Sequence, residues 1–157
     1  MAKVIFLCGF IGSGKTTYAK KLAAELPAFR FTMDEWMIPL FGEHMEREIF
    51  DARQDALYGL FQQSAISLLR LGNSVVFDCG LWQKIERIEM AQWAQAEGFE
   101  FEIHYLDVSF EQCCDRAYSR NKDRGDNAYE MTPEMMEMFW QQFEKPSAEE
   151  VVIKVYS

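Results

Sequence analysis

A glycine-rich run near the start of the chain ends in a lysine and two threonines. Its residues are Gly9, Phe10, Ile11, Gly12, Ser13, Gly14, Lys15, Thr16 and Thr17. The first eight fit the pattern Gly-x-x-x-x-Gly-Lys-Ser/Thr, in which the glycines let the backbone turn tightly and approach an anion without an intervening Cβ. Successive backbone N–H groups in such a turn point inward and bind phosphate. The run therefore predicts a phosphate-binding loop for a nucleotide.

Two side chains of this loop suit nucleotide chemistry. Lys15 can reach the β- and γ-phosphates, and the hydroxyl of Thr16 can hold Mg²⁺. A helix that starts near Gly14 would add the positive end of its dipole. We expect the rest of the loop to complete the nucleotide site through Gly9, Gly12, Ser13, Gly14 and Thr17.

The sequence on either side of the loop supports this interpretation. Residues 3–8 form a short apolar run that is typical of a buried strand. Residues 16–26 place Ala19, Leu22 and Leu26 at helical spacing. A phosphate-binding loop requires a strand before it and a helix after it, so the flanks argue against a glycine-rich turn that binds nothing.

An aspartate, Asp78, follows the apolar run at residues 75–77. Strand ends of a parallel sheet gather at one edge, so this carboxylate would lie beside the phosphate loop if the two strands are neighbours. Mg²⁺ takes one or two carboxylates together with phosphates and water. We therefore predict that Thr16 and Asp78 hold the metal. The alternative is that Asp78 only caps a turn.

A second aspartate, Asp34, ends the apolar alternation at residues 28–33. Transfer of a phosphoryl group to a hydroxyl benefits from a carboxylate that orients and deprotonates the acceptor. We expect Asp34 to have this role in preference to its neighbour Glu35, unless it only caps the following turn. An apolar patch just beyond, with Trp36 and Met37, forms either an acceptor pocket or core.

Arginines recur every four residues at Arg116, Arg120 and Arg124, next to Lys122. Arg116 and Arg120 share one face of a predicted helix, and Arg124 lies in a polar stretch that we predict to be a lid over residues 120–131. Positive charge near a transferring phosphoryl group stabilises its transition state. We expect Arg116 to bind the nucleotide and Arg120 and Arg124 to act in catalysis, against the alternative of a solvated basic face.

Apolar periodicity and the positions of glycine and proline predict alternating strands and helices. The strands are expected at residues 3–8, 28–33, 75–77, 99–108 and 151–156, and the helices at 14–26, 46–71, 83–97, 110–120 and 133–143. Pro39 and Gly42 mark an irregular link, and Ile85 and Ile88 are expected on the buried face of their helix. This order predicts a single α/β domain over residues 1–157, a three-layer fold with a five-stranded parallel sheet and helices on both faces.

Composition limits the classes of partner. The net charge of −9 disfavours nucleic acid, which usually requires a basic face. The four cysteines contain no Cys-x-x-Cys pair, and only His44 and His104 accompany them, so a zinc site is not expected. No apolar stretch is long enough to span a bilayer. We expect a cytoplasmic protein with reduced thiols that is a monomer or a homodimer.

The motifs together resemble the adenylate-kinase-like P-loop small-molecule kinases, and among them the zeta-toxin, chloramphenicol-phosphotransferase and polynucleotide-kinase branch of AAA-family ATP-binding proteins. The resemblance covers nearly the whole chain, through residues 9–17, 33–37, 75–78, 114–126 and 132–146. It implies a sheet order of 2-3-1-4-5 and ATP with Mg²⁺. It also implies an acceptor-orienting role for Asp34 and lid arginines at Arg120 and Arg124.

These observations predict a kinase that transfers the γ-phosphoryl group of ATP to a hydroxyl of a small molecule, such as a nucleoside, sugar, antibiotic or metabolite. Two alternatives stay open. One is a kinase for the 5′-hydroxyl of a nucleic acid. The other is a nucleotide-dependent switch or ATPase module without phosphotransfer.

Overall fold

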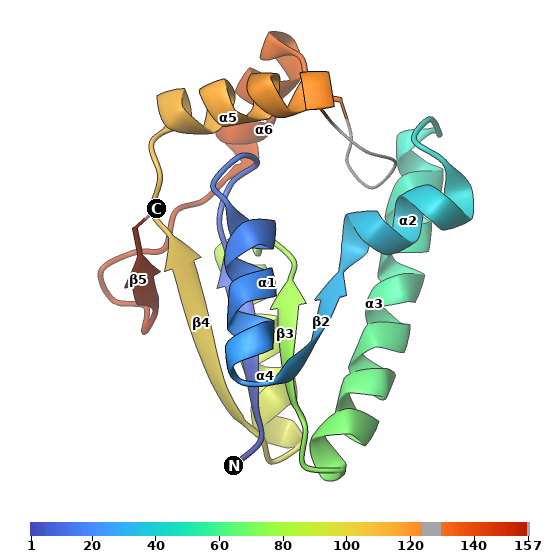
Figure 1. Cartoon of the computed structure of the whole chain (residues 1–157), viewed down its shortest axis with the longest axis vertical. Helices are drawn as coiled ribbons and strands as arrows, with labels where there is room; N and C mark the ends of the chain where they lie inside the picture. Colours follow the sequence, from blue (N-terminus) through green and yellow to red (C-terminus); the bar gives the residue numbers. More distant parts are fainter. Residues whose placement is uncertain (124–129, 157) are drawn as a thin grey trace.

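Five parallel strands form one sheet in the order β2-β3-β1-β4-β5, which confirms the predicted fold and strand order (Figure 1). The computed structural model describes residues 1–123 and 130–156. The strands are β1 (Lys3–Cys8), β2 (Ala28–Thr32), β3 (Ser74–Asp78), β4 (Glu100–Leu106) and β5 (Ile153–Val155). The helices are α1 (Lys15–Glu25), α2 (Met33–Phe41), α3 (Arg47–Arg70), α4 (Lys84–Ala96), α5 (Phe110–Asp123) and α6 (Pro133–Gln142).

The central strand β1 is buried on both faces, as expected for a parallel sheet covered by helices. Successive side chains of a strand point to opposite faces. Ile5 and Leu7 accordingly pack with Ala19 of α1, whereas Phe6 and Cys8 belong to the core on the other face. Figure 1 shows α1 in front of the sheet and α4 behind it.

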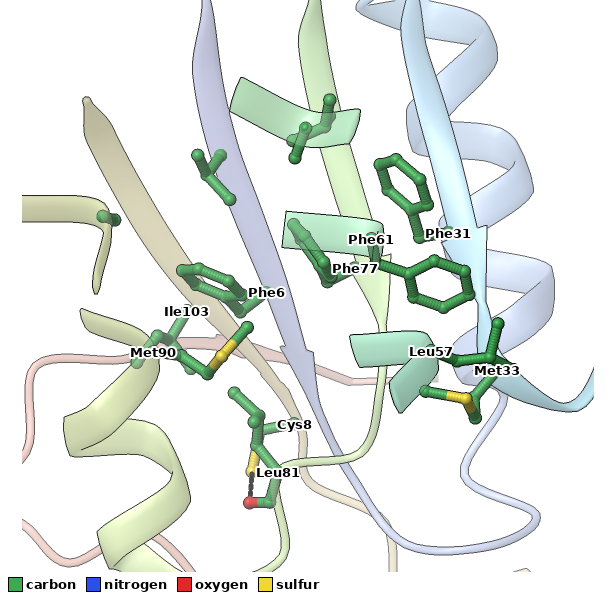
Figure 2. Packing of buried hydrophobic residues seen from close by; sticks show 14 of the residues in the cluster. Phe6, Cys8, Phe31, Met33, Leu57, Phe61, Phe77, Leu81, Met90 and Ile103 are labelled. Carbon is green, nitrogen blue, oxygen red and sulfur yellow. Dashed lines mark hydrogen bonds between the residues drawn. The ribbon is translucent and has the colours of Figure 1, made fainter. Parts of the chain in front are cut away.

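The larger core lies between the sheet and the helices α3 and α4. Figure 2 shows Phe6, Phe31 and Phe77 from three neighbouring strands against Leu57 and Phe61 of α3. The rings of Phe31 and Phe77 stack with their centroids 5.2 Å apart. This packing holds in place the strands whose carboxyl ends carry the candidate site.

Two local expectations were wrong. The segment around Pro39 is not an irregular link but the last turn of α2, which ends before Gly42. Proline removes one N–H from the helix, but Met37 and Ile38 on the preceding turn are buried, and this burial compensates for the lost hydrogen bond.

The buried face of α4 also differs from the prediction. Ile85 is 55% exposed and Ile88 is exposed as well, whereas Arg87, Met90 and Ala94 are buried. Arg87 is held inside by Glu150, which lies 63 residues away in the sequence. Local apolar periodicity carries no information on such a distant partner.

The remaining helices agree closely with their predicted ranges. Thr132 caps α6 by accepting a hydrogen bond from the N–H of Met135, and Ser109 accepts one from the N–H of Gln112 at the start of α5. α5 continues to Asp123, so the first part of the expected lid is helical. Arg124 and the rest of residues 124–129 lie outside the described residues. In the described part of the chain, no helix combines the length and apolarity needed to cross a membrane.

Candidate active site

The glycine-rich run forms a tight loop between β1 and α1, at the carboxyl ends of the strands (Figure 1). Gly12 and Gly14 have φ angles of 79° and 92°, which L side chains rarely adopt. The N–H of Ser13 donates to the carbonyl of Phe10 at 3.1 Å, and α1 starts at Lys15. A cavity of about 130 Å³ opens here, lined by Gly12, Gly14, Lys15, Thr16, Thr17, Ile11, Asp34, Arg120 and Met131.

Helix α5 packs directly against the loop. A Cβ on Gly12 would lie 2.2 Å from the carbonyl oxygen of Cys113, so a side chain at this position is excluded by backbone. Arg116, one turn further along α5, donates to the carbonyl of Ser13 at 3.3 Å. Arg116 therefore lies against the loop backbone, and the next turn places Arg120 on the small cavity.

The loop that follows β3 is joined to the first glycine. The N–H of Gly9 donates to the carbonyl of Gly80 at 2.9 Å, and the indole N–H of Trp82 donates to the carbonyl of Gly9 at 3.2 Å. Between them, Leu81 has a positive φ of 46°. The side chain of Phe10 enters an aromatic cluster, 5.4 Å from Trp82 and 5.0 Å from Trp140 between ring centroids. The start of the loop is thus held by two other segments.

Thr16 and Asp78 meet as the metal prediction requires. The Thr16 hydroxyl donates to Oδ2 of Asp78 at 2.7 Å, and the hydroxyl of Thr32 lies 3.3 Å from the same oxygen. The register of the sheet explains the contact between Thr32 and Asp78, because these residues are cross-strand partners. Asp78 is only 6% exposed. A carboxylate and a hydroxyl are oxygen ligands that suit Mg²⁺, so these residues fit a metal bound beside nucleotide phosphates.

Asp34 lies in the first turn of α2 and lines the small cavity together with Lys15 and Arg120. The walls of the cavity partly desolvate its carboxyl and raise its pKa to about 6, against the lowering effect of Lys15. The side chain of Asp34 is nevertheless exposed at the open side of the cavity. The residue at the N-cap of α2 is Thr32, so Asp34 is not the capping residue.

Glu35 points to a different environment. Its carboxylate forms an ion pair with Arg30, which also donates to Thr32. The hydrogen bond from Arg30 lowers the pKa of Glu35. Glu35 does not line either cavity, whereas Asp34 lines both. This geometry favours Asp34 over Glu35 as the acceptor-side carboxylate.

A second, larger cavity of about 770 Å³ continues from the phosphate loop and shares Lys15, Thr16 and Asp34 with the small one. Trp36, Met37 and Phe41 do not line it. Its apolar and aromatic wall consists instead of Ile11, Met33, Met45, Phe50, Tyr58, Leu81, Trp82, Met131, Met135 and Phe139. Its polar lining includes Glu43, His44, Arg47, Gln54, Gln83, Glu86, Glu130 and Gln142.

Most residues of this larger cavity were not identified from the sequence. They come from α3, from the start of α4, from the segment before α6 and from α6 itself, and no short motif marks them. On α3, Arg47 lines the cavity, whereas the guanidinium of Arg53 lies over the ring of Phe41 at 4.3 Å from its centroid.

The parallel sheet, with the glycine-rich loop between β1 and α1 at its carboxyl edge, has the P-loop fold. The AAA domain family matches residues 4–146, and the chain belongs to this family. No curated protein matches the chain.

Solved structures with this fold include kinases and other nucleotide-binding proteins. Kti12 from Chaetomium thermophilum, in complex with ADP-AlF3, is 18% identical with a TM-score of 0.72, covering 98% of this chain and 88% of that one. A gluconokinase from Sinorhizobium meliloti 1021 is 16% identical with a TM-score of 0.65, covering 98% and 82%. A chain of the Pnkp1/Rnl/Hen1 RNA repair complex is 20% identical with a TM-score of 0.73, covering 90% and 43%.

Proposed function

We propose that the protein is an ATP- and Mg²⁺-dependent kinase that transfers the γ-phosphoryl group to a hydroxyl of a small molecule. The observation that carries the proposal is the continuity of the two cavities. The phosphate loop lines one end, and a space of about 770 Å³, within the usual range for small-molecule sites, lies beyond it. Asp34 lies where the two cavities meet.

In this proposal the phosphates lie against the loop, with Lys15 on the β- and γ-phosphates and Thr16 and Asp78 on Mg²⁺. The bound metal neutralises charge on the phosphates. Arg120 lines the same cavity and stabilises negative charge on the phosphoryl group in the transition state of its transfer. Arg124 has the same proposed role from the segment that follows α5.

Asp34 orients the acceptor hydroxyl and takes its proton. A carboxylate with a raised pKa is a stronger base than an ordinary aspartate and is still ionised at neutral pH. In this proposal the base lies next to the transferred phosphoryl group, which is supported by the presence of Asp34, Lys15 and Arg120 around one cavity. The acceptor then occupies the larger cavity.

The test is a screen of hydroxyl compounds for acceptor-stimulated release of ADP, followed by Asp34→Asn. This variant keeps the shape of the side chain and removes its basicity, so turnover of an identified acceptor should fall by roughly 10²–10⁴-fold while ATP still binds. Glu35→Gln is the matched control and should retain most activity. Full activity of Asp34→Asn together with loss in Glu35→Gln would show that the other carboxylate is the base.

A nucleic-acid 5′-hydroxyl kinase is a second candidate, because one structural neighbour is a chain of an RNA repair complex. Including a 5′-hydroxyl oligonucleotide in the screen separates the two. ATP hydrolysis that no compound or oligonucleotide stimulates would instead favour a switch or ATPase module.

A further inference from the structure

We propose that the acceptor carries a protonated amine as well as the reacting hydroxyl, and that carboxylates and aromatic rings of the larger cavity recognise this amine. The inference rests on the proposed function, because it takes the larger cavity to be the acceptor site. It adds the chemical class of the acceptor, which neither the fold nor the motifs specify.

The first observation is the distribution of charge around the cavity. Three carboxylates line it beyond Asp34 and Asp78, and each comes from a different segment. Glu43 lies between α2 and α3, Glu86 lies in the first turn of α4, and Glu130 precedes α6. Three segments that converge on one space with the same charge create a field that attracts cations.

The carboxylates that line this space outnumber its lysine and arginine side chains. Lys15 lies at the phosphate loop, where its Nζ donates to the carbonyl of Phe10 at 3.0 Å. Arg47 lines the cavity but forms an ion pair with Asp51 at 3.0 Å. Arg30 is paired with Glu35. Among the described residues, the wall of the larger cavity therefore keeps an excess of negative charge.

Glu86 is partly buried in the wall of the larger cavity. Its Oε1 accepts a hydrogen bond from the N–H of Gln83 at 3.0 Å, which holds the side chain in place at the start of α4. Burial raises the pKa of this carboxyl. A cationic ligand would offset that loss of hydration, whereas an anionic ligand would add to it.

The second observation is the aromatic lining. Phe50, Tyr58, Trp82 and Phe139 all face the cavity. Organic ammonium groups bind over such rings, and the attraction strengthens where water is displaced. The guanidinium of Arg47 already lies 5.5 Å from the ring centroid of Phe50, so we assign the ammonium group to the rings of Tyr58, Trp82 and Phe139. Carboxylates and rings together match an amine on an organic skeleton better than a sugar acid or a polynucleotide.

The test compares three disaccharides of similar size: diglucosamine with two amines, neutral cellobiose, and digalacturonate with two carboxylates. Each is titrated by calorimetry into the full chain loaded with Mg²⁺ and a non-hydrolysable ATP analogue. We expect diglucosamine to bind roughly tenfold or more tightly than cellobiose, and digalacturonate to bind most weakly. The preference for the amine should decrease as salt is added.

The double variant Glu43→Gln/Glu130→Gln removes two of the charges and should abolish most of this preference. Glu48→Gln with Glu89→Gln is the matched control, because both residues are exposed and neither lines the cavity. This control should keep the preference. Glu86→Gln retains an acceptor for the N–H of Gln83 and should reduce the preference further.

Equal or tighter binding of digalacturonate, no binding of diglucosamine, or an unchanged preference in the double variant would each overturn the inference. Failure of the proposed function has a different signature. In that case diglucosamine would bind preferentially, but neither it nor any other hydroxyl compound would stimulate release of ADP from ATP.

Discussion

The hydroxyl of Thr16 donates a 2.7 Å hydrogen bond to Oδ2 of Asp78, although 62 positions separate the two residues in the sequence. The contact exists because β3 lies directly beside β1, so that the loop after one strand meets the last residue of the other. The backbone thus brings together the hydroxyl and the carboxylate that we propose as ligands of Mg²⁺.

We predict that Asp78→Asn raises the concentration of Mg²⁺ needed for half-maximal binding of ATP by at least roughly tenfold, as for other losses around a metal site. Binding of ATP in the absence of metal should change much less. Asp55→Asn, an exposed change of the same type on α3, serves as the control. An unaltered Mg²⁺ dependence in Asp78→Asn would assign this residue a structural role only.

The adjacent carboxylates Asp34 and Glu35 should affect stability in opposite directions. The folded state raises the pKa of Asp34 to about 6, so it binds a proton more tightly than the unfolded chain does. Stability therefore decreases as the pH rises from about 4 to about 6 on account of this residue. Pairing with Arg30 lowers the pKa of Glu35, so its contribution is present above the unfolded pKa and is lost as the pH falls through the folded pKa.

Thermal unfolding across this pH range measures both effects. Asp34→Asn should melt at a higher temperature than the unmodified protein at pH 7, with the difference vanishing below pH 4. Glu35→Gln should melt at a lower temperature at pH 7. The same sign for both variants at pH 7 would contradict the assigned environments.

Gly12 and Gly59 provide a second matched pair. Gly12→Ala introduces a Cβ into the carbonyl of Cys113 at a positive φ, and we expect a loss of at least about 1–2 kcal/mol in stability together with loss of nucleotide binding. Gly59 lies within α3 with no atom near the position of its Cβ. Gly59→Ala should stabilise the protein by about 0.5–1 kcal/mol. Chemical denaturation and calorimetry with ATP give the two readings.

The buried ion pair of Arg87 and Glu150 should matter more than the exposed pairs. Arg87 is 2% exposed and contacts both carboxylate oxygens of Glu150, at 2.6 and 3.1 Å, while it also donates to the carbonyl of Leu81. Glu150→Gln leaves the guanidinium without its counter-charge and should cost about 3 kcal/mol in the free energy of unfolding.

Glu97→Gln is the comparison for that prediction, because its partner Arg70 lies 3.8 Å away and is mostly exposed. An exposed pair of this kind contributes less than about 1 kcal/mol. Similar losses in the free energy of unfolding for Glu97→Gln and Glu150→Gln would show that the buried pair stabilises the protein no more than the exposed pair. Denaturant unfolding measures both.

The phosphate end of the site, together with Asp34, could be predicted from the sequence because the signals are local. The phosphate loop is one contiguous motif, and Asp34 and Asp78 each end a recognisable apolar segment. The rule that strand ends gather at one edge of a parallel sheet then brings them together. The observed contacts of Thr16 with Asp78, and of Asp34 with the cavity of the loop, agree with that reasoning.

The wall of the larger cavity could not be predicted, because its residues come from segments that are far apart in the sequence and meet only in the folded chain. Tyr58 of α3 and Phe139 of α6 are more than 80 positions apart in the sequence, and both line one cavity. The buried face of α4 was missed for the same reason, since Arg87 is stabilised by Glu150 and not by a neighbour on its own helix. Apolar periodicity describes one element at a time.

The position of Trp82 makes the protein its own optical reporter. Its indole N–H donates to the carbonyl of Gly9 at the entrance of the phosphate loop, and its ring faces the larger cavity. Indole fluorescence depends on the polarity and hydrogen bonding around the ring. Binding of the nucleotide or of the acceptor should therefore change the wavelength or the intensity of the emission from Trp82. We expect binding of nucleotide and of acceptor to change the contribution of Trp82 to the emission of the four tryptophans, without an attached dye.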